Sequence, residues 1–159
     1  MKIRISNRQK RFQIYPSTIK NICAEVLTCE GEPESVELDV SIVSDEEIEQ
    51  LNEQYLQHTG PTDVLSFSQR EGDDVDGLDD QIGDVVVSAD RAFEQSAIFD
   101  TSFNEEFALY IIHGILHLLG YDDTTDEDKD CMEKRQQYLL QKLVRAGGSI
   151  QLISDQTEG

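Results

Sequence analysis

The chain has 159 residues, a length that suits one domain with a single hydrophobic core. Its 33 acidic and 13 basic residues give a formal net charge of −20, so the protein repels polyanions at long range. No stretch approaches the roughly 20 apolar residues that span a bilayer, residues 1–16 lack the apolar segment of a secretory signal, and the three cysteines have no CxxC spacing. We therefore expect a cytoplasmic protein without a membrane partner, a disulfide framework or a cysteine-based zinc site.

In chain order, the hydrophobic pattern predicts four strands and about five helices. Alternating or short continuous apolar residues predict strands over residues 2–5, 36–43, 64–67 and 82–87. Helical spacing and capping signals predict helices over residues 16–31, 44–55, 88–99, 102–120 and 125–145. We expect an α+β fold with a single mixed four-stranded sheet. Residues 1–146 would form one domain, followed by a loosely ordered C-terminal tail over 147–159.

One predicted helix carries the residues with the clearest chemistry. The run FALYIIHGILHLL is apolar on nearly every face, which indicates a buried helix. His113 and His117 lie four positions apart, on one face and one turn from each other, where two imidazoles can bind one metal ion. Gly120 ends the helix, and the turn that follows can bring Asp123 to the same ion. Three protein ligands leave a fourth position open, as in catalytic metal sites.

The pattern of this helix allows two other interpretations. Histidines in a buried helix are often hydrogen-bonded core residues, and motif matches give false positives. The His113–His117 spacing also resembles that of zinc peptidases, but Gly114 stands where their HExxH motif has a glutamate base. That difference argues against a peptidase, and the small residue would leave room beside the metal for a bulky substrate.

Basic residues are concentrated at the start of the chain. Five cations and no acid occur within the first eleven positions: Lys2, Arg4, Arg8, Lys10 and Arg11. They are either a basic patch through which an acidic protein approaches RNA, or the charges of an edge strand that discourage aggregation.

Three sequence blocks resemble the YbeY family of bacterial endoribonucleases. They are HGILHLLGYD over residues 113–122, PTDVLSF over 61–67 and GDVVVS over 83–88. The resemblance implies an α+β fold with a cleft that holds one zinc ion. It also implies cleavage of single-stranded RNA, a role in small-subunit ribosomal RNA maturation and ribosome quality control, and contacts with ribosome-associated proteins.

The chain departs from the family pattern at two positions. The third zinc ligand of the family is a histidine, and Asp123 stands there. A carboxylate is a competent zinc ligand, but two histidines with one carboxylate also suit non-haem iron, so another divalent metal is an alternative to Zn²⁺. An arginine of the family is replaced by Leu56, and His58 is either a partial substitute for it or an exposed loop histidine.

These patterns lead to one functional hypothesis and one alternative. In the first, the protein is a metal-dependent hydrolase whose catalytic and metal-binding residues are His113, His117 and Asp123. Supporting roles fall to Tyr121 and Asp122 near the turn, to Thr62, Asp63 and Ser66 on the cleft floor, and to Asp84, which orients a ligand or caps a strand. In the alternative, the protein is a non-catalytic ribosome-assembly or RNA-adaptor protein whose metal is structural or lost.

Overall fold

The backbone forms a mixed four-stranded sheet with helices packed on it. The computed structural model describes residues 1–56, 63–69, 80–147 and 150–155. Its strands are β1 (Lys2–Asn7), β2 (Phe12–Ile14), β3 (Glu37–Val43), β4 (Val64–Ser68), β5 (Gln81–Ser88) and β6 (Ile153–Asp155). Its helices are α1 (Pro16–Cys29), α2 (Asp45–Leu56), α3 (Ala89–Phe99), α4 (Phe103–Leu118) and α5 (Asp126–Gly147).

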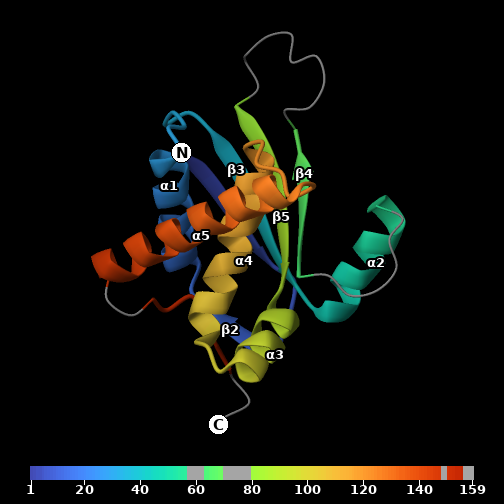
Figure 1. Ribbon diagram of the computed structural model, residues 1–159. Helices are drawn as coiled ribbons and strands as arrows, with labels where there is room; N and C mark the ends of the chain where they lie inside the picture. The colour runs from blue at the N-terminus through green and yellow to red at the C-terminus, as the bar shows by residue number, and fades with distance from the viewer. Residues whose placement is uncertain (57–62, 70–79, 148–149, 156–159) are drawn as a thin grey trace.

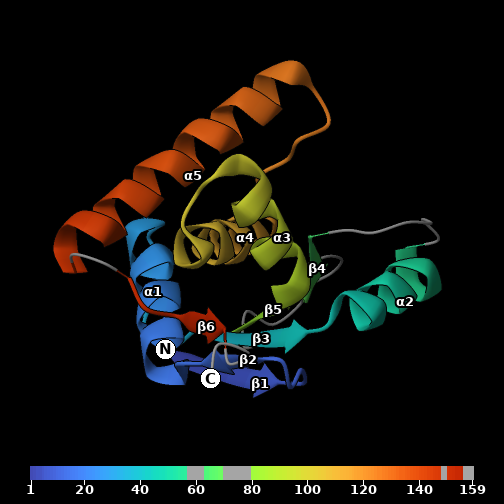
Figure 2. The ribbon, with the colours of Figure 1, turned by 90° about the horizontal axis from the view of Figure 1, so that it is seen from below.

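The sheet has the strand order β1-β3-β5-β4. β1, β3 and β5 are parallel, and β4 pairs antiparallel with β5, so β1 and β4 are the two edges. Figures 1 and 2 show α1, α4 and α5 gathered on one side of this sheet, with α2 beyond the β4 edge. The α+β fold, its mixed four-stranded sheet and the five predicted helices are confirmed.

The two faces of the sheet have different environments. Alternate residues of β3, including Leu38 and Val40, belong to the main core under α1 and α4. On the opposite face, Val43 and Val86 form a smaller cluster with Ile48 of α2. The same opposite face carries a polar group around Arg4, which accounts for the alternating pattern of β1 and β3.

The predicted helix starts coincide with side-chain caps. The hydroxyl of Ser44 accepts a hydrogen bond from the Glu47 amide, and that of Ser102 accepts one from the Glu105 amide. Ser88 caps α3 in the same way. These bonds satisfy amides that lack a partner within the helix, so the chain enters each helix at a defined residue.

A second, two-stranded sheet was not predicted. β2 pairs antiparallel with β6, and Leu152 and Ile153 are almost completely buried. The side chain of Asn104, at the start of α4, accepts hydrogen bonds from the amides of Leu152 and Ile153. Residues 152–155 are therefore packed against the core, unlike the loosely ordered tail expected over 147–159. The domain boundary at residue 146 stays a prediction.

Within the described residues, no helix combines the length and the apolar character needed to cross a membrane. His58 and Thr62 lie outside the described residues, as does the side chain of Leu56.

Candidate metal centre

Helix α4 brings the two histidines together. His113 and His117 project from successive turns, their ring centroids are 4.5 Å apart, and their planes are inclined by 77°. The two Nε2 atoms lie 3.0 Å from each other. Since most of the other residues in this part of α4 are buried, the helix cannot rotate without exposing its apolar surface, and the two imidazoles are held in this arrangement.

Gly114 lets α4 lie directly on the sheet. A Cβ atom at this position would stand 2.6 Å from Cγ1 of Val85, closer than atoms in contact can lie. The Gly114 carbonyl also accepts a hydrogen bond from Ser66 Oγ, 2.9 Å away, which links α4 to β4. The interpretation that a small residue at 114 leaves room for substrate is therefore wrong, because the space beside it is filled by the sheet.

A tight turn returns the chain to the histidines. Gly120 has a φ of 104°, which favours glycine, and ends α4 as predicted. The Asp122 carboxylate then accepts hydrogen bonds from the Asp123 amide at 2.7 Å and from the Thr124 amide at 3.2 Å. The Thr124 hydroxyl donates a third, and these bonds hold the pKa of Asp122 below its usual value. The Asp122 carboxylate therefore shapes the turn.

The turn places Asp123 next to His117. Asp123 Oδ2 lies 3.6 Å from His117 Nε2. One nitrogen or oxygen atom from each of His113, His117 and Asp123 falls within a group whose members are all within 4.8 Å of one another. Ligands of one tetrahedral Zn²⁺ ion lie about 3.4 Å apart, because the bonds from zinc to nitrogen or oxygen are about 2.0–2.2 Å long. The separations and the donor types therefore fit a divalent metal held by two imidazoles and one carboxylate.

Gln136 of α5 completes this group and was not predicted. The Nδ1–H group of His113 donates a hydrogen bond to Gln136 Oε1, an atom that can only accept. The Nε2 atom that faces His117 is therefore the unprotonated one, as a metal ligand requires. Burial lowers the pKa of His113, which also favours the neutral ring. No local pattern predicts this contact, since 23 positions separate the two residues.

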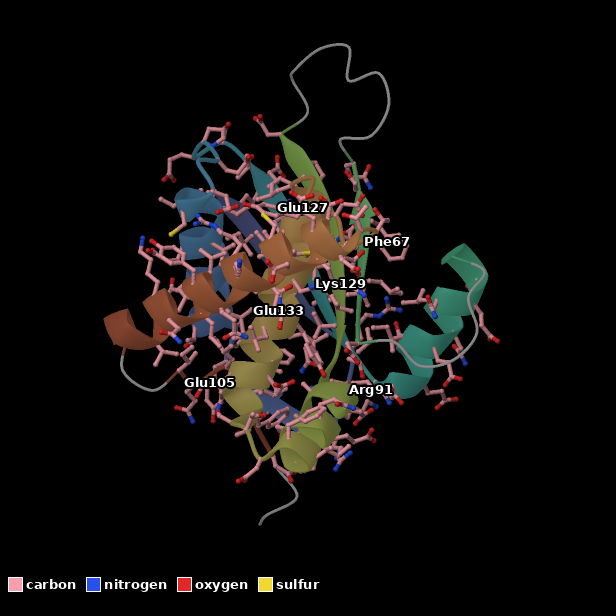
Figure 3. The ribbon with its side chains drawn as sticks, viewed as in Figure 1. Phe67, Arg91, Glu105, Glu127, Lys129 and Glu133 are labelled. Atoms are coloured by element: carbon pink, nitrogen blue, oxygen red, sulfur yellow. The ribbon has the colours of Figure 1, made fainter. Side chains whose placement is uncertain are left out.

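The three candidate ligands lie in a cleft of about 880 Å³ between β4 and α4. Polar and apolar side chains both line it: Asp63, Val64, Leu65, Ser66, Phe67, Ser68, Leu109, Tyr110, His113, His117, Leu118, Asp123 and Gln136. Asp63 and Ser66 thus line the cleft, as expected from the sequence. Figure 3 shows Phe67 on β4 and, farther along the same side of the molecule, Arg91 from α3.

Asp84 and Tyr121 do not reach the candidate ligands. Asp84 is in register with Asp39 on the face of the sheet opposite to Val85, and its pKa is raised by burial and by the Asp39 charge. Tyr121 points its hydroxyl at Glu30, at the end of α1. Neither residue is part of the cleft lining in the described part of the chain.

The predicted basic patch is mostly neutralised by acids. Arg4 pairs with Asp39 and Glu37, Arg8 with Glu47, and Arg11 with Asp90. These contacts, and the position of β1 at the sheet edge, support the edge-strand interpretation. Among the described lining residues of the cleft there is no lysine or arginine, and Arg91 reaches its rim through Asp63, with 3.4 Å between Nε and Oδ1.

Comparison with known proteins connects this geometry to one family. A family model described as Endoribonuclease YbeY matches residues 4–144. A protein named Endoribonuclease YbeY from Syntrophotalea carbinolica is 40% identical over 143 residues, which cover 89% of this chain and 95% of the relative. A protein of the same name from Clostridioides difficile is 37% identical over 148 residues, 90% of this chain and 97% of the relative. A solution structure of a Thermotoga maritima protein is similar with a TM-score of 0.63 and 30% identity, over 91% of this chain and 90% of the other.

Proposed function

Because the chain belongs to the YbeY family of endoribonucleases, we propose that it is a metal-dependent endoribonuclease that cuts single-stranded RNA. The observation that carries the proposal is the convergence of His113, His117 and Asp123 in a cleft. By the same family relationship, its substrates would include ribosomal RNA of the small subunit. It would then serve in rRNA maturation and ribosome quality control with ribosome-associated proteins. The three free thiols fit the reducing cytoplasm as its place of action.

In this proposal each residue of the site has a defined task. His113, His117 and Asp123 would hold the ion, with Zn²⁺ as the first candidate, and Gln136 keeps the His113 ring in the tautomer that can bind it. When bound, a divalent metal supplies Lewis-acid stabilisation of charge on a phosphodiester and lowers the pKa of water.

The cleft itself favours a single strand over a duplex. Its wall contains the aromatic side chains of Phe67 and Tyr110, and stacking on such side chains is available only to bases released from a helix. Its polar lining, which includes Ser68 and Asp63, suits ribose hydroxyls. The formal charge of −20 opposes binding of long RNA, which leaves local contacts in the cleft to select the substrate.

The first test is metal content followed by RNA cleavage. Elemental mass spectrometry on protein purified without chelators should find one metal ion per chain in the wild type and in Asp126→Ala, and strongly reduced metal in Asp123→Ala. Asp126→Ala is a matched control because it removes a carboxylate from the start of α5, outside the candidate ligand group. Single-stranded RNA should be cut by the wild type, spared after chelation, and cut again when Zn²⁺ is returned.

The second candidate function is a non-catalytic ribosome-assembly or RNA-adaptor protein, which is favoured by Leu56 in place of the family's arginine and by Asp123 in place of its third histidine. A folded wild type that retains one metal ion and cuts neither single-stranded nor double-stranded RNA would support this adaptor. Unfolding on chelation, without any turnover beforehand, would identify the metal as structural. Retention of both metal and cleavage by His117→Ala would refute the proposed centre.

A further inference from the structure

A buried carboxylate joins α1 and α5 to the turn that precedes Asp123. Glu30 lies at the C-terminal end of α1, and its side chain is only 6% exposed. The Tyr121 hydroxyl donates to Glu30 Oε1 over 2.6 Å, and Nε of Arg135 donates to Glu30 Oε2 over 2.7 Å. A second guanidinium nitrogen of Arg135 approaches the Cys29 carbonyl at 3.4 Å. A buried carboxylate with both oxygens satisfied and its charge balanced is held in one position.

This group connects the loop of Asp123 to two helices. Tyr121 directly follows Gly120, where α4 ends, and its amide donates to the Leu116 carbonyl at 3.0 Å. Both its backbone and its hydroxyl are therefore fixed, the first to α4 and the second to the end of α1. Figure 1 shows α5, the source of Arg135, crossing α4 with α1 beside them.

The position of Asp123 depends on this anchor. The Asp123 side chain is 42% exposed, so packing alone does not fix it. Its amide is held by Asp122, the residue next to Tyr121. A shift of Tyr121 would thus be passed through one residue to the carboxylate that lies 3.6 Å from His117. Since a metal tolerates only small changes in its ligand distances, the anchor sets how well the third ligand fits.

Helix α5 supports two of the three candidate ligands from adjacent positions. Arg135 acts on Asp123 through Glu30 and Tyr121, whereas Gln136 bonds to His113. From these contacts we propose that Glu30, with Tyr121 and Arg135, is a positioning residue that sets the affinity and geometry of the metal centre from outside the cleft. The proposal rests on the metal centre of the proposed function.

The experiment is a Co²⁺ titration of the metal-free protein, followed by visible absorption. Tyr121→Phe removes one hydroxyl and no charge. We expect it to weaken Co²⁺ binding about tenfold, which is the lower end of the loss usual for residues that support metal ligands. We also expect it to alter the visible spectrum of the bound Co²⁺. Glu30→Gln should show at least the same loss. The double variant Glu30→Gln/Tyr121→Phe should bind no more weakly than Glu30→Gln alone, because both substitutions break the same contact.

Tyr15→Phe is the matched control. It deletes a tyrosine hydroxyl that contacts Ser154 Oγ at 3.3 Å, at the opposite end of α1 from Glu30. It should leave the Co²⁺ affinity and spectrum unchanged. Thermal unfolding of each metal-free variant measures its stability separately from its Co²⁺ affinity. Tyr15→Phe can lower the stability of the fold, but a positioning role predicts that only Tyr121→Phe also lowers the Co²⁺ affinity.

The outcomes distinguish the two proposals. Tight Co²⁺ binding by the wild type, together with wild-type affinity and spectrum in Tyr121→Phe, would overturn the positioning role and leave the metal centre in place. A wild type that binds no Co²⁺ would overturn the metal centre and the positioning role together. Weakened binding and a changed spectrum in Tyr121→Phe, but not in Tyr15→Phe, would support both.

Discussion

Gln136 and His113 form a hydrogen bond in which the imidazole Nδ1 is the donor and the amide oxygen the acceptor. The bond joins α5 to α4 and decides which ring nitrogen is left to bind a metal. A position on α5 therefore acts on a candidate ligand that α4 supplies.

Replacement of Gln136 should weaken metal binding without removing a ligand. Gln136→Leu deletes the acceptor, so the His113 ring can rotate or take the other tautomer, and we expect metal affinity to fall by about tenfold to a hundredfold. Chelator competition on the purified variant measures this change. Gln137→Leu, the same substitution at the exposed neighbouring position, should bind as the wild type does. Equal affinity in both variants would show that the bond does not support the site.

A methyl group at position 114 should destabilise the fold. In Gly114→Ala the added Cβ meets Val85, and such overpacking costs about 1–3 kcal/mol of the free energy of unfolding. Urea denaturation monitored by circular dichroism gives the value. Val85→Ala makes room for the new methyl, so the double variant should be more stable than the sum of the two single losses predicts. Strict additivity would mean that α4 moves away from the sheet instead.

The ion pair between Arg4 and Asp39, on the face of the sheet opposite to the main core, should make the free energy of unfolding depend on pH. The Arg4 guanidinium beside Asp39 lowers the pKa of that carboxyl, and Gln81 adds to the effect. The folded pKa therefore lies below the unfolded value of about 3.9. The stabilisation is complete above that value and is lost as the pH falls through the folded pKa.

The pH dependence expected from the Arg4–Asp39 pair can be tested by comparing Arg4→Gln with the wild type. Arg4→Gln should be less stable than the wild type near neutral pH, and the two curves of unfolding free energy should converge as the pH falls below about 4. High salt should also reduce the difference, because both groups are partly exposed. Lys10→Gln removes the same charge elsewhere and serves as the control. A difference that persists unchanged at low pH would exclude the ion pair as its source.

The buried thiol of Cys23 and the exposed thiol of Cys131 should differ in their reactivity toward alkylating reagents. Cys23 is fully buried in the core, and burial raises the pKa of its thiol to about 12, so almost no thiolate is present at pH 8. Cys131 is exposed. Peptide mass spectrometry after iodoacetamide treatment should find Cys131 alkylated in the folded protein and Cys23 alkylated only after denaturation. Alkylation of both at the same rate would mean that the core around Cys23 opens readily.

Local patterns in the sequence were sufficient for most of the fold and for the candidate ligands. The spacing of Ile19, Ile22 and Val26 predicts a helix face that is indeed buried, and the serine caps locate the helix starts. The prediction of α4 with His113 and His117 rests on residues within one helix. Such signals involve neighbours in the chain, where geometry follows directly from the period of the helix.

Contacts between distant residues could not be predicted in this way. Glu30 and Tyr121 are 91 positions apart, and nothing in either neighbourhood indicates the other. The N-terminal arginines show their charge in the sequence but not their acidic partners on β3, α2 and α3. Strands β2 and β6 were missed because each has three residues, too few for the alternation that identifies a strand.

The pairing of β2 with β6 has a consequence for the order of folding. Tyr15 and Ser154, 139 positions apart, come into contact at this small sheet, so all of the intervening chain must be synthesised before the sheet can close. Until then, the Asn104 side chain at the start of α4 cannot accept hydrogen bonds from the amides of Leu152 and Ile153. The helix that carries both histidines also lacks the packing that these two residues provide. A chain emerging from the ribosome therefore cannot complete these contacts of α4 before residues 152 and 153 have been synthesised.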